Sequence, residues 1–138
     1  MQFTILIVDD DDDDITLFCD AVHHINKAYR CIAASNGREA LQLLQHAILK
    51  PDFIFMDLNL PFINGKECLT LIKKNRELAH IPVIIYSTSK LQTDIDEVYK
   101  LGAANFLTKP NSFREIIKMV SNILIEEKEK LTTKKLMN

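Results

Sequence analysis

The sequence lacks several features that would place it in other classes of protein. No stretch of its 138 residues is apolar for long enough to span a membrane, and its start has no basic region of the kind found in signal peptides. The formal net charge is only -2, which gives no basis for binding nucleic acid through bulk charge. We therefore predict no direct contact with a membrane or with nucleic acid.

Cysteine is scarce and scattered. Cys19, Cys31 and Cys68 form neither a CxxC pair nor a metal-ligand spacing. An odd number of dispersed thiols is typical of proteins that are kept reduced in the cytosol, so a cytoplasmic location is expected. There is also no internal repeat, no linker and no low-complexity segment apart from the acidic run Asp9 to Asp14. A chain of this length without a break is predicted to form a single domain over residues 1–138.

What the sequence does contain is a set of short apolar runs, of which Phe53 to Met56 is the clearest. This run lies between Pro51 and Pro61 and stops at Asp57. It is typical of a strand buried on both faces, and such strands belong to parallel sheets covered by helices. A carboxylate that ends such a strand lies at the rim where open α/β sheets bind ligands. Asp57 is therefore a candidate reactive group, although an Asp that merely begins a turn has the same local pattern.

Similar apolar runs alternate with segments of helical period along the chain. Strands are predicted at residues 3–8, 29–34, 52–57, 81–86 and 103–107, with helices beginning near residues 15, 37, 64, 91 and 112. This alternation predicts an α/β fold, a five-stranded parallel sheet with right-handed helical crossovers. Arg30 indicates an edge position for the second strand. The predicted core spans about residues 3–125, and residues 126–138 either extend the last helix or fray.

Polar residues mark the predicted helix starts. Asn36 with Glu39, and Ser112 with Glu115, have the spacing of a capping box, and Asn64 is a predicted N-cap. The second helix is predicted to have an apolar face made of Ala40, Leu41, Leu44, Ala47 and Ile48.

Other polar side chains gather where the predicted strands end. The first strand ends at Asp9 and Asp10, the third at Asp57, the fourth at Ser87 and the fifth at Lys109. Taken singly, the lysine reads as a surface residue and the serine as a turn hydroxyl. Because the carboxyl ends of parallel strands share one edge of the sheet, four strand ends bring all of these side chains to the same rim.

The chemistry of this rim points to a phosphoryl group. Clustered carboxylates repel one another, so either their pKa values rise or a cation lies among them. Oxygen ligands without His or Cys favour Mg²⁺ over zinc. A metal ion and an ammonium neutralise phosphoryl charge, and a hydroxyl donates to a phosphoryl oxygen. Asp57 is itself a possible acceptor, since carboxylates form acyl phosphates.

The remaining carboxylates, Asp11 to Asp14, have a simpler interpretation. They occupy the predicted first turn of the first helix, where the helix dipole favours negative charge by ~0.3–1 kcal/mol each. We interpret them as capping or solvated residues and leave the chemistry to Asp9 and Asp10.

The sequence resembles response-regulator receiver domains of the CheY-like superfamily, of the stand-alone single-domain type. The resemblance covers residues 3 to about 125. Its motifs are Ile-Leu-Ile-Val-Asp9-Asp10, Met56-Asp57-Leu58-Asn59-Leu60-Pro61, Asn64-Gly65, Pro82-Val83-Ile84-Ile85-Tyr86-Ser87-Thr88 and Gly102-Ala103-Ala104-Asn105-Phe106-Leu107-Thr108-Lys109-Pro110. It implies a doubly wound, flavodoxin-like (CheY-like) sheet with the strand order 2-1-3-4-5. Ser87 departs slightly from the family, in which threonine is more usual at this position.

The resemblance implies roles for the carboxylates. Asp57 is expected to be the phospho-acceptor. Asp10, Asp57 and the backbone carbonyl of Asn59 are expected to bind Mg²⁺ directly, with Asp9 acting through water.

The resemblance also implies a switch. Ser87 is expected to hydrogen-bond a phosphoryl oxygen and Lys109 to pair with it, while Phe106 moves inward as the serine is drawn to the phosphate. The peptide bond between Lys109 and Pro110 is expected to be cis.

Partners follow from the same resemblance. A sensor histidine kinase or a phosphotransfer protein is expected to supply the phosphoryl group from a phosphohistidine. The face formed by the fourth helix, fifth strand and fifth helix is expected to bind a downstream protein or a second copy of the chain. Residues 126–138 are too few and too polar for an output domain, so signalling by protein contact is expected. The chain is expected to be a regulator and not an enzyme, catalysing only its own phosphoryl transfer and autodephosphorylation.

Three other functions share part of this pattern. A Mg²⁺-dependent aspartyl-phosphate phosphatase of the haloacid-dehalogenase type needs a second Asp two residues after its nucleophile on the first strand. Asp10 and Asp12 imitate that spacing, but Asp57 on a middle strand has no place in it. A flavin-binding module needs a phosphate loop rich in Gly, Ser and Thr where this chain has carboxylates. A pseudo-receiver that only binds partners would lack the acceptor or metal ligands, and none is missing.

Overall fold

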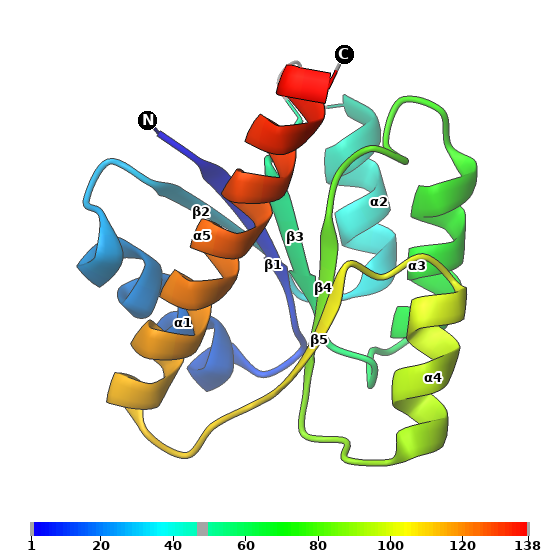
Figure 1. Cartoon of the computed structure of the whole chain (residues 1–138). Coiled ribbons are helices and arrows are strands. Elements are labelled where there is room, and N and C mark those ends of the chain that lie inside the picture. Colours follow the sequence, from blue (N-terminus) through cyan, green and yellow to red (C-terminus); the bar gives the residue numbers. More distant parts are fainter. Residues whose placement is uncertain (1, 47–49, 138) are drawn as a thin grey trace.

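The computed structural model describes residues 2–46 and 50–137, which form a five-stranded sheet (Figure 1). The strands are β1 (Thr4–Val8), β2 (Arg30–Ala34), β3 (Phe53–Met56), β4 (Val83–Ser87) and β5 (Asn105–Thr108). Their spatial order is β2-β1-β3-β4-β5, and every neighbouring pair is parallel. The predicted α/β fold and strand order are confirmed.

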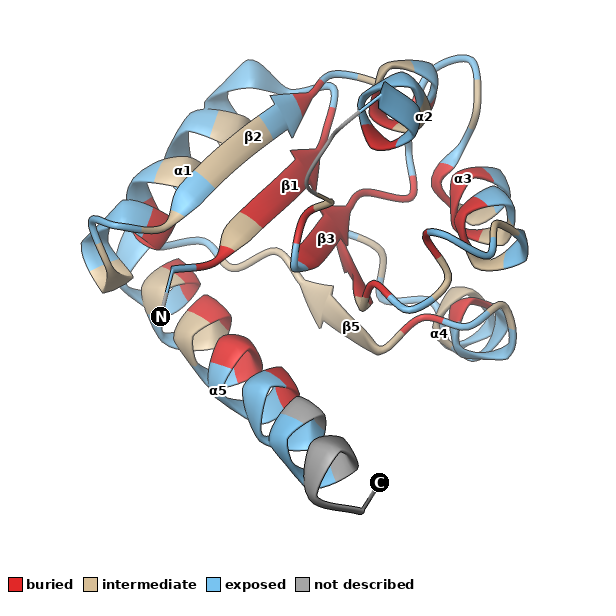
Figure 2. Ribbon diagram, turned by 90° about the horizontal axis from the view of Figure 1, so that it is seen from above, coloured by how far each residue is buried: buried red, intermediate tan, exposed pale blue. Residues whose placement is uncertain are grey.

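Helices cover both faces of the sheet. They are α1 (Asp12–Ile25), α2 (Gly37–His46), α3 (Gly65–Lys74), α4 (Gln92–Lys100) and α5 (Phe113–Met137). Helices α1 and α5 lie on one face, and α2, α3 and α4 lie on the other (Figures 1 and 2). The strand order runs from β1 outward to β2 and then returns past β1 to β3. The adjacent strands β1 and β3 are therefore followed by helices on opposite faces of the sheet, α1 on one and α3 on the other. Ligand sites of open α/β sheets form beside the carboxyl ends of such a pair.

Strand β3 is the centre of the core. Its four residues are fully buried, as the uninterrupted apolar run predicted. Phe53 and Phe55 pack in the cluster under α1 and α5, whereas Ile54 and Met56 pack in the cluster under α2, α3 and α4. This alternation follows from the two-residue period of a strand. The edge position predicted for β2 is also confirmed, and Arg30 on this strand is exposed.

Helix caps agree with the sequence in part, since the hydrogen bonds of the described residues show one half of each predicted capping box. Asn64 accepts a hydrogen bond from the Glu67 N–H as the N-cap of α3, and Ser112 Oγ accepts from the Glu115 N–H at 3.2 Å. Before α2, the Glu39 N–H donates to Asn36 Oδ1 at 2.8 Å, which is half of the predicted capping box. The other half is wrong, because the Glu39 carboxylate accepts from the backbone and hydroxyl of Ser35 instead. Ser35 has two donors for the Glu39 carboxylate, its N–H and its hydroxyl, whereas the backbone of Asn36 has only one. Ala47 and Ile48 lie outside the described residues.

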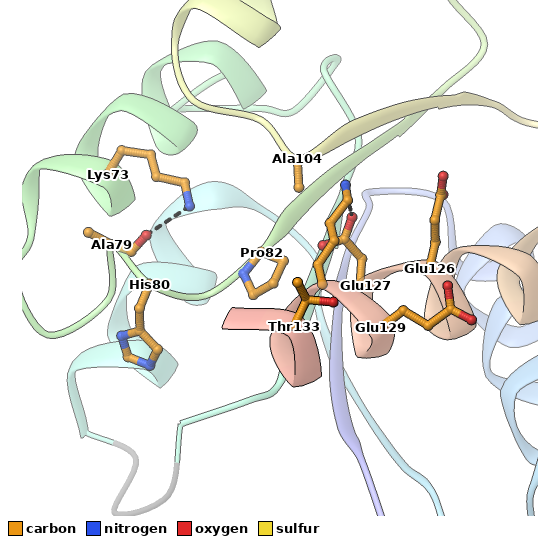
Figure 3. Close-up of a pocket in the computed structure, with 10 residues that line it drawn as sticks. Lys73, Ala79, His80, Pro82, Ala104, Glu126, Glu127, Glu129 and Thr133 are labelled. Atoms are coloured by element: carbon orange, nitrogen blue, oxygen red, sulfur yellow. Dashed lines mark hydrogen bonds and ion pairs between the residues drawn. The ribbon is translucent and has the colours of Figure 1, made fainter. Parts of the chain in front are cut away.

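Helix α5 runs to Met137, so residues 126–137 continue the last helix. Within this part, Glu127 is buried, with an exposed fraction of 4%. The helix end forms one wall of a groove of about 700 Å³, and Lys73, His80 and Pro82 line the other side (Figure 3). The groove lies at the amino edge of the sheet, opposite the strand ends that the sequence marked. Among the described residues, no helix is both long and apolar enough to cross a membrane.

Candidate functional site

The sheet brings the predicted rim residues together through backbone hydrogen bonds at the carboxyl ends of its strands. The Asp9 N–H donates to the Ala34 carbonyl and the Asp57 N–H to the Val8 carbonyl, each at 3.0 Å. These bonds continue the ladders of β1 with its two neighbours by one residue. As a result, Asp9 and Asp57 are fixed side by side at the end of the strands.

Three carboxylates converge at this point. One oxygen each of Asp9, Asp10 and Asp57 lies within 4.8 Å of the others. Asp9 and Asp57 are buried, with exposed fractions of 1% and 6%, whereas Asp10 is exposed. Like charges at this separation repel, and burial strengthens the effect because little water screens them.

Lys109 opposes these charges. Its Nζ lies 2.7 Å from Asp9 Oδ2, 2.8 Å from Asp14 Oδ2 and 2.9 Å from Asp57 Oδ2, and its side chain is only 10% exposed. Burial by itself lowers the pKa of Lys109, but the three carboxylates of Asp14, Asp9 and Asp57 beside it outweigh this effect, so the net pKa is raised above the usual range. The ammonium is therefore charged at every physiological pH.

Burial disfavours the charged form of Asp9. Desolvation raises the pKa of Asp9 above 3.8, although the nearby Lys109 ammonium and the hydrogen bond from the Asp11 N–H act in the opposite direction. Its Oδ2 is close to the Lys109 ammonium but is not aligned for a hydrogen bond, and it has no other partner among the described residues. A carboxyl whose pKa is raised by folding lowers stability as the pH rises from its ordinary pKa through its folded one.

Asp57 keeps one oxygen toward the ammonium and the other toward a backbone donor. Its Oδ1 accepts a hydrogen bond from the Asn59 N–H at 3.2 Å, while Oδ2 accepts from Lys109. The side chain of Asn59 is exposed, so this residue adds backbone groups at the rim. Both carboxylate oxygens are thus oriented before any ligand binds.

Ser87 and Phe106 lie on the two strands beside Asp57. Ser87 ends β4 and is fully buried, and its carbonyl accepts from the Lys109 N–H at 2.8 Å. Phe106 on β5 is half-buried and packs against the cluster under α2, α3 and α4. The expected cis bond between Lys109 and Pro110 is wrong, because the described residues contain no cis peptide bond. The two isomers of an X–Pro bond differ locally by only ~0.5–1 kcal/mol, so the motif alone does not fix the isomer.

Asp14 is a site residue that the sequence reasoning missed. Asp11 fulfils the capping prediction, since its side chain accepts the N–H groups of Asp13 and Asp14. The Asp14 side chain instead reaches Lys109, which is 95 positions later in the chain. The only local signal for it was its place in the first turn of α1, the helix that begins directly after Asp9 and Asp10.

The donor set of the cluster fits a hard divalent cation. Its ligand atoms are carboxylate oxygens, and three negative charges face one ammonium. Oxygen ligands of this kind are those that Mg²⁺ prefers. Asp10 is the ligand best placed to gain from a cation, because the described residues hold no lysine, arginine or histidine nitrogen within 4.0 Å of it.

Replacing Asp10 with asparagine is therefore expected to have opposite effects on metal binding and on the metal-free protein. Mg²⁺ binding should be lost, while the thermal midpoint in EDTA should rise by on the order of a few degrees, because the uncompensated repulsion is removed. Calorimetry in EDTA measures the second effect. Asp20→Asn, an exposed change farther along α1, is the control for general charge. A lower midpoint for Asp10→Asn would mean that hydrogen bonds already compensate the cluster.

Comparison with known proteins identifies the family. The family model of the response regulator receiver domain matches residues 5–121. The chain belongs to this family. Receiver domains are the CheY-like regulatory modules of two-component signalling, and the acidic cluster of this receiver domain is compatible with Mg²⁺.

Two curated relatives are single-domain response regulators. The chain is 32% identical over 124 residues to Rcp1 of Synechocystis sp., covering 86% of this chain and 84% of Rcp1. It is also 32% identical over 124 residues to the polar-differentiation regulator DivK of Brucella anthropi, covering 90% of this chain and 98% of DivK. The receiver domain therefore accounts for most of each relative.

Solved structures of response regulators are similar to this structure over most of the chain. The phosphorylated cyanobacterial phytochrome response regulator RcpA has a TM-score of 0.82 and 30% identity, covering 89% of this chain and 91% of that one. The Mn²⁺-bound form of Rcp1 has a TM-score of 0.78 and 32% identity, covering 88% and 91%. CheY4 of Vibrio cholerae, at 24% identity and a TM-score of 0.78, covers 89% and 99% and shares the fold.

Proposed function

We propose that this receiver domain accepts a phosphoryl group on Asp57 from the phosphohistidine of a sensor histidine kinase or a phosphotransfer protein, in a Mg²⁺-dependent reaction. The observation that carries the proposal is the environment of Asp57. Its carboxylate lies 2.9 Å from the Lys109 ammonium, beside two further carboxylates able to hold a divalent cation. A carboxylate so placed is a nucleophile with positive charge available on both sides of the incoming phosphoryl group.

Each residue of the site has a part in this reaction. A carboxylate oxygen of Asp57 attacks phosphorus, and the bond from phosphorus to the donor histidine breaks. Lys109 then pairs with a phosphoryl oxygen, and the Ser87 hydroxyl donates to another. Lys109 already contacts Asp57, whereas the Ser87 hydroxyl is drawn toward the phosphoryl group as the transfer occurs.

The metal would be held by Asp10, Asp57 and the Asn59 carbonyl, with Asp9 acting through water. It would supply positive charge at the phosphoryl oxygens. The Mn²⁺-bound structure of Rcp1 and the phosphorylated structure of RcpA support a divalent ion and a phosphoryl group at a site of this family.

The proposal is tested by incubating the chain with a small phosphodonor and following its intact mass. A Mg²⁺-dependent mass increase of one phosphoryl group, reversed by slow hydrolysis, is the expected result. No increase in the presence of Mg²⁺ would contradict the proposal. Turnover of many equivalents of a phosphate ester would instead indicate a phosphatase, whereas this chain acts only on its own acyl phosphate.

Output passes through the face formed by α4, β5 and α5, to a downstream protein or to a second copy of the chain. Ser87 pairs with Thr108 across β4 and β5, and Phe106 pairs with Ile85 on the same two strands. Tyr99 on α4 is 46% exposed, and its hydroxyl contacts Asn105 of β5 at 3.2 Å. A serine drawn toward the phosphate frees space for the Phe106 ring and so alters this face.

The proposed location is the cytoplasm, where the three free thiols of the chain are kept reduced.

Beryllofluoride with Mg²⁺, which mimics the acyl phosphate, is expected to shift amide NMR signals across residues 87–117. The physical reason is that a ligand shifts the equilibrium between two conformations by as much as its affinities for the two differ. The same titration of Asp57→Asn is the control and should leave these signals unchanged. Shifts confined to the loops beside Asp57 would contradict the coupling to the output face.

A further inference from the structure

Lys109 divides its charge among three carboxylates, and one of them, Asp14, has no part in the reaction described so far. The Lys109 Nζ is 2.7 Å from Asp9, 2.8 Å from Asp14 and 2.9 Å from Asp57. The ammonium donates hydrogen bonds to Asp14 and Asp57, and it forms an ion pair with Asp9. The three carboxylates therefore compete for a single positive charge.

The Asp14 side chain is not needed to begin helix α1. Asp11 Oδ1 already accepts the N–H groups of Asp13 and Asp14, at 2.9 and 3.1 Å. Asp12 and Asp13 add negative charge to the first turn and are exposed to solvent. Of the residues in this turn, Asp14 is the one whose carboxylate reaches the ammonium.

Asp14 approaches Lys109 from the solvent side. Its side chain is 35% exposed, compared with 1% for Asp9 and 9% for Asp57. The two buried carboxylates and the ring of Tyr86, 5.8 Å from Nζ, hold the ammonium without it. Removing the Asp14 charge is therefore expected to leave Lys109 in place. The change leaves more of the ammonium charge available to interact with a group on Asp57.

We propose that Asp14 shares the Lys109 ammonium with the phosphoryl group and thereby shortens the lifetime of the acyl phosphate, an inference that rests on the proposed function. A phosphoryl group on Asp57 carries about two negative charges. It needs the ammonium more than the free carboxylate does, yet Asp14 neutralises part of the ammonium charge. Two anions bound to one Nζ also lie close enough to repel each other.

Hydrolysis relieves this repulsion. Water attacks phosphorus, the bond between phosphorus and the Asp57 oxygen breaks, and inorganic phosphate leaves with both protons of the water. Asp57 returns to a free carboxylate with one negative charge. The acyl phosphate is thus raised in free energy by Asp14 more than the product is, and the barrier to its loss is lower.

The test compares variants in one turn of α1. The chain and its variants are phosphorylated with acetyl phosphate at saturating Mg²⁺, the donor is removed by desalting, and the loss of the phosphoryl group is followed by intact mass. Asp14→Asn is expected to extend the lifetime by about five- to tenfold, the size of a close charge repulsion at a partly exposed site. Asp14→Glu, which keeps the charge within reach of Lys109, should restore the natural lifetime.

Asp13→Asn is the matched control, since it removes the same charge from an exposed neighbour without the Lys109 contact. Its lifetime should stay within about twofold of the natural chain, because solvent screens exposed charges. Equal lifetimes for Asp13→Asn and Asp14→Asn, or a shorter lifetime for Asp14→Asn, would overturn the inference while the proposed function stands. Failure of the natural chain to form any acyl phosphate would overturn the proposed function instead.

Discussion

Replacing Asp57 with asparagine is expected to abolish acyl-phosphate formation. The change keeps the size of the side chain but removes the nucleophilic oxygen anion, and an amide does not form a stable acyl phosphate under these conditions. Intact mass after incubation with a small phosphodonor and Mg²⁺ should show no phosphorylated species, whereas the natural chain should be labelled. Of the changes considered for this site, it has the largest expected effect on phosphoryl transfer.

A second variant, Asp52→Asn, is the control for Asp57→Asn. Asp52→Asn removes a carboxylate from the opposite end of β3, where Asp52 Oδ2 accepts from the Thr4 N–H at 2.8 Å. That variant should be labelled like the natural chain, because Asp52 lies at the amino edge of the sheet. An unchanged yield from Asp57→Asn would move the acceptor to another residue, with Asp9 and Asp10 as the nearest carboxylates.

Replacing Gly65 with alanine is expected to cause the largest loss of stability among single changes beside the site. A Cβ at this position would lie 2.4 Å from the Asp57 carbonyl oxygen and 2.7 Å from Leu58 Cα. These are backbone atoms of the segment that orients Asp57, and the Gly65 N–H donates to the Leu58 carbonyl at 2.9 Å. Overpacking costs about 1–3 kcal/mol. Alanine's better helix propensity returns at most about 1 kcal/mol.

Thermal or urea unfolding of Gly65→Ala should therefore show a net loss of about 1–2 kcal/mol. Lys74→Ala, an exposed change at the other end of α3, should stay within about 0.5 kcal/mol of the natural chain. Phosphorylation of Gly65→Ala should also slow, because the Asp57 backbone has to move. Unchanged stability would mean that the start of α3 can shift away from β3 without cost.

The sequence alone was sufficient to predict the fold and the convergence of the rim residues. The apolar run of β3 required burial on both faces, and the alternation of strands with helices required parallel pairing. Once the strands are parallel, the positions of Asp9, Asp57 and Lys109 at strand ends place them on one edge. These inferences succeed because periodicity and strand ends are properties of local sequence.

The contact between Asp14 and Lys109 was decided only by the tertiary structure. The local pattern assigns Asp11 to Asp14 alike to a helix start as capping or solvated residues, and Asp11 is indeed the cap. It does not distinguish Asp14 from Asp13, because the partner that separates them lies 95 positions away on another strand end. The same holds for Glu39, which bonds to Ser35 and not to the predicted partner. Side-chain pairing depends on how helices and strands pack at distances of a few ångströms, and the periodicity that fixes the fold carries no information at that scale.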